Sequence, residues 1–178
     1  MPETFFTSDT HFGHEKLCTT FTRPDGSPAR SFSCSQEMDE HMVSQWNSVV
    51  RDCDTVYHLG DVLISKSHFP TLSRLKGKLR LVRGNHDIFD DKMYHQHFKR
   101  LLGVKMFPKR GIVCTHIPVH TSQLEFRWNF NIHGHLHHHL VLDSSGKPDN
   151  RYINVCGEHH DYVPVSMAQI DQIIKERI

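Results

Sequence analysis

The sequence predicts an α/β protein that forms a single domain, residues 1–178. Five short apolar segments each end abruptly in polar residues, and segments with helical periodicity lie between some of them. A buried strand that stops in this way delivers polar groups into a loop, which is how α/β proteins build sites at the carboxyl ends of their strands. A chain of 178 residues is also long enough to bury one sizeable core. The five predicted strands are residues 4–8, 55–59, 79–82, 111–115 and 130–132.

Composition predicts a soluble, cytoplasmic protein with no membrane segment and no bulk attraction to nucleic acid. The formal net charge is only +1, and the chain shows neither a leader peptide nor an apolar stretch of about 18 residues. The five cysteines form no C-x-x-C pair, so neither a disulfide framework nor a thiolate zinc site is expected. The 17 histidines are an excess that asks for a functional reason, because imidazole is the commonest metal ligand.

Helix signals lie between the strands. The longest helix is expected to begin at an N-cap, Ser35, and its apolar residues recur on one face of a 3.6-residue period. That face comprises Met38, Met42, Trp46, Val49 and Val50. A short helix over 69–75 is closed by Gly77, and a polar helical piece is expected over 91–101. Residues 18–35 form a long loop, and such loops are usually functional or disordered.

The last forty residues are expected to hold a β-hairpin and a helix. The extended runs 139–142 and 151–155 face each other across a turn-rich segment and predict the hairpin. A capping box, Ser166 with Gln169, predicts the start of the C-terminal helix. Its inner face comprises Met167, Ile170, Ile173, Ile174 and Ile178.

Potential metal ligands follow all five predicted strands. They are carboxylates, one amide and several imidazoles, with no sulfur among them: Asp9 and His11, then Asp61, then Asn85 with His86, then His116, and finally His135 and His137. Such a nitrogen and oxygen set suits two borderline divalent ions, Mn, Fe, Ni, Co or Zn, and does not suit a structural zinc. Two of the pairs are spaced by two residues, so an extended backbone would project both members of a pair to the same side.

The ordered motifs D-T-H, G-D, G-N-H-D, T-H and H-G-H-L-H resemble those of the calcineurin-like metallophosphoesterase superfamily. In detail the chain is most similar to short, cap-less bacterial and phage phosphoesterases that begin S-D-x-H-F-G-H. The resemblance implies an α/β/β/α sandwich of two mixed β-sheets flanked by helices. It also implies two divalent metal ions, of which Mn is the first choice. One ion would bind Asp9, His11, Asp61 and His137, and the other would bind Asp61, Asn85, His116 and His135.

The resemblance further implies a phosphoric ester hydrolase that acts by direct attack of a hydroxide bridging the two ions. Two divalent cations close together lower the pKa of a shared water, so that hydroxide is available near neutral pH, and they stabilise the charge of the transition state. His86 would be the catalytic residue, acting on the leaving oxygen as a general acid or as a cationic stabiliser. Protein Ser/Thr phosphatases of the superfamily carry a second aspartate where this chain has Ile64. That difference argues against protein phosphatase activity and leaves the orienting partner of His86 open, with Asp87 as one candidate.

Three further residues are candidates for substrate binding. His14, Arg23 and Arg127 lie in loops that could reach a small phosphorylated substrate, either a phosphomonoester or a phosphodiester, nucleotides included. Two other functions stay open. One is a binding module of the same fold with little activity, and the other is a nuclease, for which no extended basic groove or aromatic series is visible. The oligomeric state is not determined by the sequence.

The remaining histidines have structural interpretations. His58 lies inside an apolar strand and His133 points away from His135 in an extended backbone, so both are expected in the core or behind the ligands. His159 and His160, beside Glu158 and Asp161, could form an adventitious site, but a solvated loop is the expectation.

Overall fold

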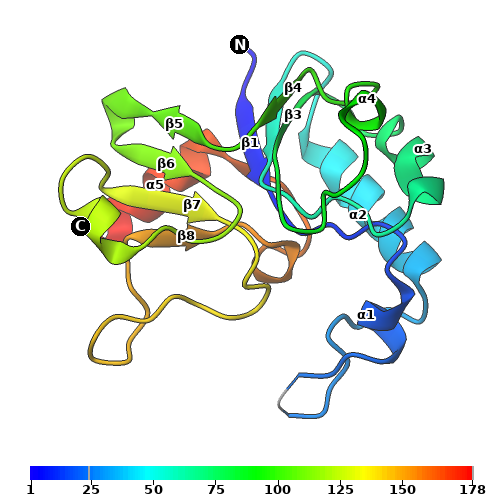
Figure 1. The fold of residues 1–178 in the computed structure, drawn as a ribbon, viewed down its shortest axis with the longest axis horizontal. Coiled ribbons are helices and arrows are strands. Elements are labelled where there is room, and N and C mark those ends of the chain that lie inside the picture. The colour runs from blue at the N-terminus through cyan, green and yellow to red at the C-terminus, as the bar shows by residue number, and fades with distance from the viewer. Residues whose placement is uncertain (24, 178) are drawn as a thin grey trace.

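A computed structural model, which describes residues 1–23 and 25–177, shows an α/β protein with two mixed β-sheets (Figure 1). The first sheet has the strand order β4-β3-β2-β1-β9. Its strands are β1 (Thr4–Thr7), β2 (Thr55–His58), β3 (Lys78–Val82), β4 (Arg100–Leu102) and β9 (Val165–Ser166). The first four run parallel, and β9 is antiparallel to β1.

The second sheet has the order β5-β6-β7-β8. Its strands are β5 (Lys105–Phe107), β6 (Ile112–Cys114), β7 (Phe130–His133) and β8 (Tyr152–Asn154). β6, β7 and β8 are parallel, whereas β5 is antiparallel to β6. In Figure 1 the arrowheads of β7 and β8 point toward the first sheet, so the loops that leave the two sheets converge in the middle of the molecule.

Five α-helices accompany the sheets in the described part of the chain. They are α1 (Glu15–Thr19), α2 (Ser35–Val49), α3 (Phe69–Leu72), α4 (Asp91–Tyr94) and α5 (Met167–Arg177). Short 3-10 turns add η1 (Lys66–His68), η2 (Pro108–Arg110), η3 (Thr121–Leu124) and η4 (Gly157–His159). Within the same residues, no helix combines the length and the hydrophobicity needed to cross a bilayer.

The side chains of the first sheet enter two apolar clusters, one on each face, because successive side chains of a strand point to opposite faces. Phe5, Val56 and Leu81 pack against α2 and α3 on one face. Phe6 and Tyr57 join a second cluster that includes side chains of β6, β7 and β8. This second cluster therefore lies between the two sheets.

The resemblance implies that helices cover the outer face of the second sheet, but the structure has a different cover there. Val113 and Tyr152 pack with Leu124 and Trp128, which belong to η3 and to the segment that follows it. The buried side chains of α5 instead join the cluster between the sheets. The α/β class with two mixed sheets is confirmed, and an irregular segment forms this outer cover.

Two predicted elements are wrong. The helical piece expected over 91–101 is helical only in α4, and residues 100–102 form β4, which extends the first sheet beside β3. Residues 139–142 do not pair with 151–155 as a hairpin; β8 instead lies parallel to β7, and Ile153 enters the cluster between the sheets. In both cases long-range pairing with a buried strand overrides the local pattern. The strands β5 and β9 were not predicted.

The helix ends follow the predicted signals with small shifts. α2 begins at Ser35 itself, so Cys34 occupies the N-cap, and Val49 is exposed where the pattern predicted burial. The capping box of α5 is confirmed: Ser166 N donates to Gln169 Oε1 at 2.8 Å, and Gln169 N donates to Ser166 Oγ at 3.2 Å. Ile178, expected on the inner face of this helix, lies outside the described residues.

Candidate metal centre

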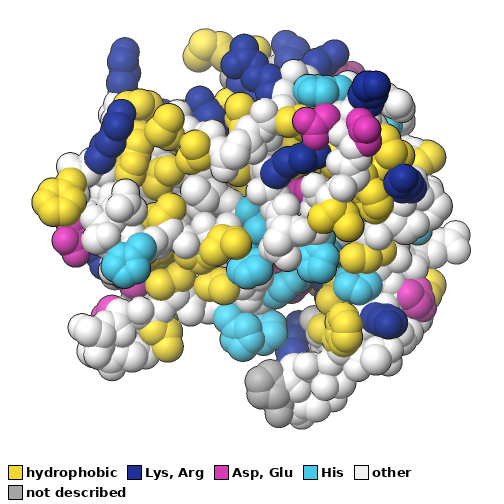
Figure 2. Space-filling view, viewed as in Figure 1, with side chains coloured by type: hydrophobic (Ala, Val, Ile, Leu, Met, Phe, Trp, Pro, Cys, Tyr) yellow, Lys and Arg dark blue, Asp and Glu magenta, His cyan; other side chains and the backbone are white. Residues whose placement is uncertain are grey.

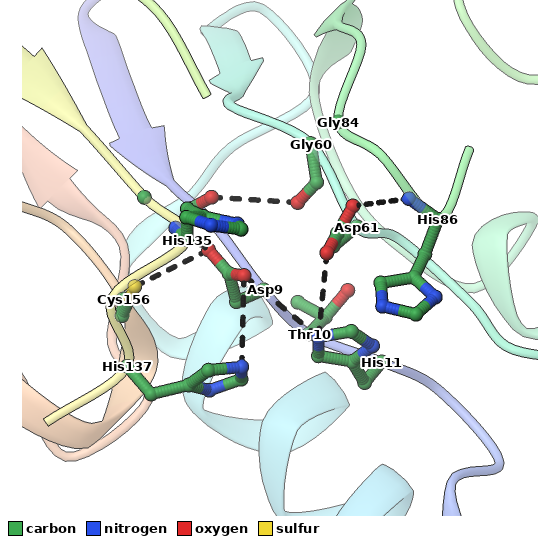
Figure 3. Close-up of polar contacts among 12 residues, drawn as sticks. Asp9, Thr10, His11, Gly60, Asp61, Gly84, His86, His135, His137 and Cys156 are labelled. Carbon is green, nitrogen blue, oxygen red and sulfur yellow. Dashed lines mark hydrogen bonds and ion pairs between the residues drawn. The ribbon is translucent and has the colours of Figure 1, made fainter. Parts of the chain in front are cut away.

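Six of the seven predicted ligands form two groups that could each hold a metal ion. One group is Asp9, His11 and His137, and the other is Asp61, His116 and His135. Within each group the ligand atoms all lie within 4.8 Å of one another. Figure 3 shows the two aspartates facing each other from neighbouring loops, with imidazole rings around them. These side chains follow β1, β2, β6 and β7, whose ends meet, so ligands separated by up to 128 residues in the chain supply one site.

Asp61 lies between the two groups. Its Oδ2 is 3.7 Å from Nε2 of His11 in the first group and 3.4 Å from Nε2 of His116 in the second. Its Oδ1 accepts a hydrogen bond of 2.8 Å from the backbone N–H of His86. The seventh predicted ligand, Asn85, also reaches the second group, because its Oδ1 is 2.9 Å from Nε2 of His116. The structure therefore brings all seven residues together.

Five of the predicted ligands have backbone angles in the left-handed region. Positive φ angles occur at Asp9 (56°), His11 (48°), Asp61 (57°), His135 (68°) and His137 (49°). Non-glycine residues rarely adopt this conformation, and it persists only where the surrounding structure imposes it. The prediction that an extended backbone aligns the paired ligands is therefore wrong, since tight turns place them. His135 and His137 consequently enter different groups.

Two glycines allow the loops to approach each other. A Cβ at Gly84 would lie 2.2 Å from Asp61 Oδ1, and a Cβ at Gly134 would lie 1.9 Å from Ser8 Oγ and 2.4 Å from Asp9 Oδ2. Neither position has room for a side chain. The glycines in the motifs G-N-H-D and H-G-H-L-H are thus explained by close packing against the two aspartates.

The protonation states of Asp61 and His11 suit the binding of a cation. Burial opposes ionisation of Asp61, but the hydrogen bond and charge of His116 lower the pKa of its carboxyl to about 2. Burial and then the charge of Arg30 hold the pKa of His11 well below its usual value. At neutral pH Asp61 is therefore a carboxylate and His11 a neutral imidazole. Metal ligands must be deprotonated in this way to bind.

Unpartnered atoms support the same conclusion. Asp9 Oδ2 accepts from the N–H of His135 at 2.8 Å and from the thiol of Cys156 at 3.2 Å. Asp9 Oδ1, which is buried, has no hydrogen-bond partner among the described residues, and neither has Nδ1 of His11. Burying a carboxylate oxygen without a partner is costly. The residues present therefore fit divalent metal ions.

His86 lies at the edge of the site, and Asp87 does not contact its ring as an orienting partner would. The exposed ring of His86 is 5.4 Å from the ring of His11, centroid to centroid. The buried carboxylate of Asp87 accepts from the backbone N–H groups of Asp61 (2.8 Å), Val62 (3.0 Å) and Gly84 (2.8 Å). Asp87 thus fastens the loop that carries Asp61 and does not orient His86.

The site opens into a cavity of about 630 Å³, where histidine side chains gather in the middle of the face shown in Figure 2. Three of the predicted ligands, His11, His135 and His137, line this cavity. The other lining residues are His14, Lys16, Leu17, Phe21, Ala29, Ile64, His86, Leu136, His138, His139 and Glu158. Of the predicted substrate-binding residues, His14 therefore lies at the cavity. Arg23 lines a separate hollow of about 290 Å³ that shares Glu158 with the first. Arg127 is exposed and lies over the Trp128 ring, outside both linings.

Comparison with known proteins identifies relatives of this chain. No protein-family model matches it. The uncharacterized protein MJ1445 of Methanocaldococcus jannaschii is 32% identical over 187 residues, which covers 99% of this chain and 93% of the relative. This chain belongs to the MJ1445 family. The gene 66 protein of Mycobacterium phage L5 is 27% identical over 175 residues, covering 80% of this chain and 81% of the phage protein.

The MJ1445-family fold is also similar to that of a solved structure. The protein of unknown function AQ665 from Aquifex aeolicus superposes with a TM-score of 0.69 and 23% identity. The match covers 98% of this chain and 100% of the Aquifex protein. At this identity the likeness shows a shared fold.

Three residues near the site of this MJ1445-family protein were not predicted to take part in it. Cys156 contacts Asp9 as described above, and Arg30 and Glu158 form a buried ion pair with Nη2 to Oε1 at 2.8 Å. The expectation of a solvated loop holds for His159, which is exposed, but not for the neighbouring Glu158, whose side chain is only 3% exposed. Although burial opposes ionisation, the charge of Arg30 and the hydrogen bond from His137 lower the pKa of Glu158 well below its usual value. No sequence pattern links Arg30 to Glu158, because the two residues are 128 positions apart and meet only in the folded protein.

The structural interpretation of His58 and His133 is confirmed. Both are about 1% exposed, and burial lowers the pKa of each to about 4. Nε2 of His58 is 3.0 Å from Thr10 Oγ1, which itself donates to the carbonyl of Val62 at 2.7 Å. Because that hydroxyl donates its proton to Val62, His58 donates to Thr10. His58 thus links the loop after β1 to the loop after β2.

Proposed function

We propose that this protein is a metal-dependent phosphoric ester hydrolase of the calcineurin-like metallophosphoesterase superfamily. The observation that carries the proposal is the placement of the Asp61 carboxylate between two donor groups, three of whose imidazoles (His11, His135 and His137) line a cavity. Seven residues would hold two ions: Asp9, His11, Asp61, Asn85, His116, His135 and His137. When bound, a pair of divalent ions supplies a low-pKa water and stabilises charge on the phosphoryl oxygens. Manganese is the proposed metal, with Fe, Ni, Co and Zn as alternatives.

The chain's own residues would bind the substrate and assist the leaving group. The backbone N–H of His86 donates a hydrogen bond to Asp61, and the side chain of His86 lines the cavity. A protonated imidazole there can donate its proton to the ester oxygen that leaves. His14 and Lys16 can bind the anionic part of the substrate, since both line the same cavity.

The cavity favours a small substrate with an apolar organic group. Phe21, Leu17 and Leu136 contribute apolar surface beside the donor groups. Phe21 is 46% exposed, and its ring stands edge-on to that of His14 at 5.7 Å between centroids. An exposed aromatic ring in a cavity that is also lined by the ammonium group of Lys16 suits a flat group attached to a phosphate. We therefore propose a phosphomonoester or phosphodiester of a small molecule, with nucleotides as one class.

An assay of p-nitrophenyl phosphate and bis(p-nitrophenyl) phosphate in the presence of Mn²⁺ tests this proposal. We expect turnover of at least one ester, lost on chelation and restored by metal. Asp61→Asn keeps the acceptor for the His86 N–H but removes the shared charge, so it should abolish metal binding and turnover together. Asp52→Asn is the matched control, because Asp52 is exposed and lies outside the cavity lining. A metal-loaded protein that turns over neither ester between about pH 6 and pH 9 would contradict the proposal and favour a binding module of the same fold.

A further inference from the structure

His137 is held at three points by the segment that follows β8. Asn154 Nδ2 and His159 Nε2 both donate to the carbonyl of His137, at 2.9 Å and 2.8 Å. The ring nitrogen Nδ1 of His137 is 2.8 Å from Glu158 Oε1. The backbone of His137 has a φ of 49°, which is unfavourable unless such contacts hold it.

The contact with Glu158 determines which nitrogen of His137 carries the proton. A carboxylate only accepts hydrogen bonds, so Nδ1 must be the donor. In the neutral ring Nε2 then keeps its lone pair, and Nε2 is the atom that lies 3.9 Å from Asp9 Oδ1. Glu158 thereby presents to the donor group the nitrogen that can bind a cation. Carboxylates play this part behind many metal-binding histidines.

Arg30 joins the same arrangement from the long loop between α1 and α2. Its fully buried guanidinium donates to Thr10 O at 2.8 Å and to Asp9 O, which fixes the turn that carries Asp9. It also donates to Glu158 Oε1 from Nε and Nη2, at 3.0 Å and 2.8 Å. A buried positive charge beside a cation site would repel the cation, and the charge of Glu158 offsets it.

We propose that Glu158 and Arg30 are positioning residues for the group formed by Asp9, His11 and His137. Glu158 sets the tautomer of His137 and neutralises Arg30, and Arg30 fixes the backbone of Asp9 and Thr10. This inference rests on the proposed function only in that it requires the group to bind a metal ion. A purely structural ion pair would stabilise the fold without controlling either the tautomer or the affinity for metal.

The tautomer can be measured in the metal-free protein without any variant. Long-range ¹H–¹⁵N NMR spectra of the histidine rings distinguish a proton on Nδ1 from one on Nε2, and His137→Gln assigns the signal. At a pH high enough for the His137 ring to have lost one of its two protons, we expect the remaining proton on Nδ1, and we expect Glu158→Ala to shift it at least in part to Nε2. A wild-type ring that carries its proton on Nε2, or a tautomer unchanged in Glu158→Ala, would overturn the inference.

Calorimetric titration with Mn²⁺ tests the effect on affinity. Glu158→Gln preserves the shape and the acceptor atom but removes the charge, so we expect one of two ions to bind about ten- to a hundredfold more weakly. Glu125→Gln, at an exposed residue outside the cavity lining, is the matched control and should bind as the wild type does. Arg30→Lys keeps the charge but loses the forked contacts, and it should weaken the same ion. Circular dichroism and melting curves verify folding of each variant.

The outcomes separate this inference from the proposed function. If Glu158→Gln binds Mn²⁺ as the wild type does, the inference is overturned while ester hydrolysis can still hold. If the tautomer and affinity results are as expected but no phosphoric ester is turned over, the inference stands and the hydrolase proposal fails.

Discussion

The substitution Asp87→Asn tests whether the loop carrying Asp61 is held by one buried carboxylate. Oδ2 of Asp87 accepts from two backbone N–H groups, those of Asp61 and Gly84, and Oδ1 accepts from the N–H of Val62. An asparagine can keep one oxygen toward the first pair, but its amide N–H₂ would then face the N–H of Val62. The variant therefore loses one buried hydrogen bond outright, and the two that remain are no longer assisted by a negative charge.

The loss of that bond should cost about 1.5–3 kcal/mol, the usual value for a hydrogen bond to a charged group. For a protein of this size, a loss of about 2 kcal/mol lowers the melting temperature by about 4–8 °C. Thermal unfolding of the metal-free protein, followed by circular dichroism, measures the effect. Calorimetry should also show weaker Mn²⁺ binding, because the backbone N–H of Asp61 loses its anchor.

The reasoning would be refuted if Asp87→Asn melted within about 1 °C of the wild type and bound Mn²⁺ equally well. A loss of turnover with unchanged stability and unchanged metal affinity would instead indicate that Asp87 acts on His86. Asp52→Asn, at an exposed position, is again the matched control.

Two further predictions concern acid stability and close packing. The carboxyl of Asp54 accepts hydrogen bonds from the side chain of Arg51 and the backbone N–H of Glu3, which lower its pKa from an ordinary 3.8. Because the folded-state pKa is lowered, this stabilisation is present above the unfolded value and is lost as the pH falls below about 4; melting curves should therefore show a smaller acid-induced loss in Asp54→Asn than in the wild type, and equal losses would contradict the prediction. Gly134→Ala places a methyl group 1.9 Å from Ser8 Oγ and 2.4 Å from Asp9 Oδ2, so it should destabilise the protein by about 1–3 kcal/mol and weaken Mn²⁺ binding, which unfolding and calorimetry measure; unchanged affinity would show that the loops can move apart.

Local patterns were sufficient where the chain's own neighbours decide the structure. The strands that precede the polar motifs appear within about one residue of their predicted places, because an apolar run ended by polar residues must be buried and then leave the sheet. The capping box of α5 is likewise local, since Ser166 and Gln169 satisfy each other's backbone groups.

Local patterns failed where distant segments compete for a strand. The helical piece predicted over 91–101 ends in residues that pair with β3. The run 151–155, predicted as half of a hairpin, contains residues 152–154, which pair with β7. Alternation of apolar and polar residues states that a segment is extended, but it does not state which strand lies beside it. That choice depends on which neighbouring strand lets the segment bury its apolar side chains, as Ile153 does between the sheets.

The sequence by itself determined the chemistry of the candidate site: which donors are present, their order along the chain, and their position at the ends of strands. Only the tertiary structure decided that Asp61 lies between the two groups, that five ligands sit on left-handed backbone, and that Arg30 and Glu158 stand behind His137. The physical reason is that residue identity limits what a side chain can bind, whereas the position of its atoms depends on contacts between residues as far as 147 positions apart in the chain, as between Asp9 and Cys156.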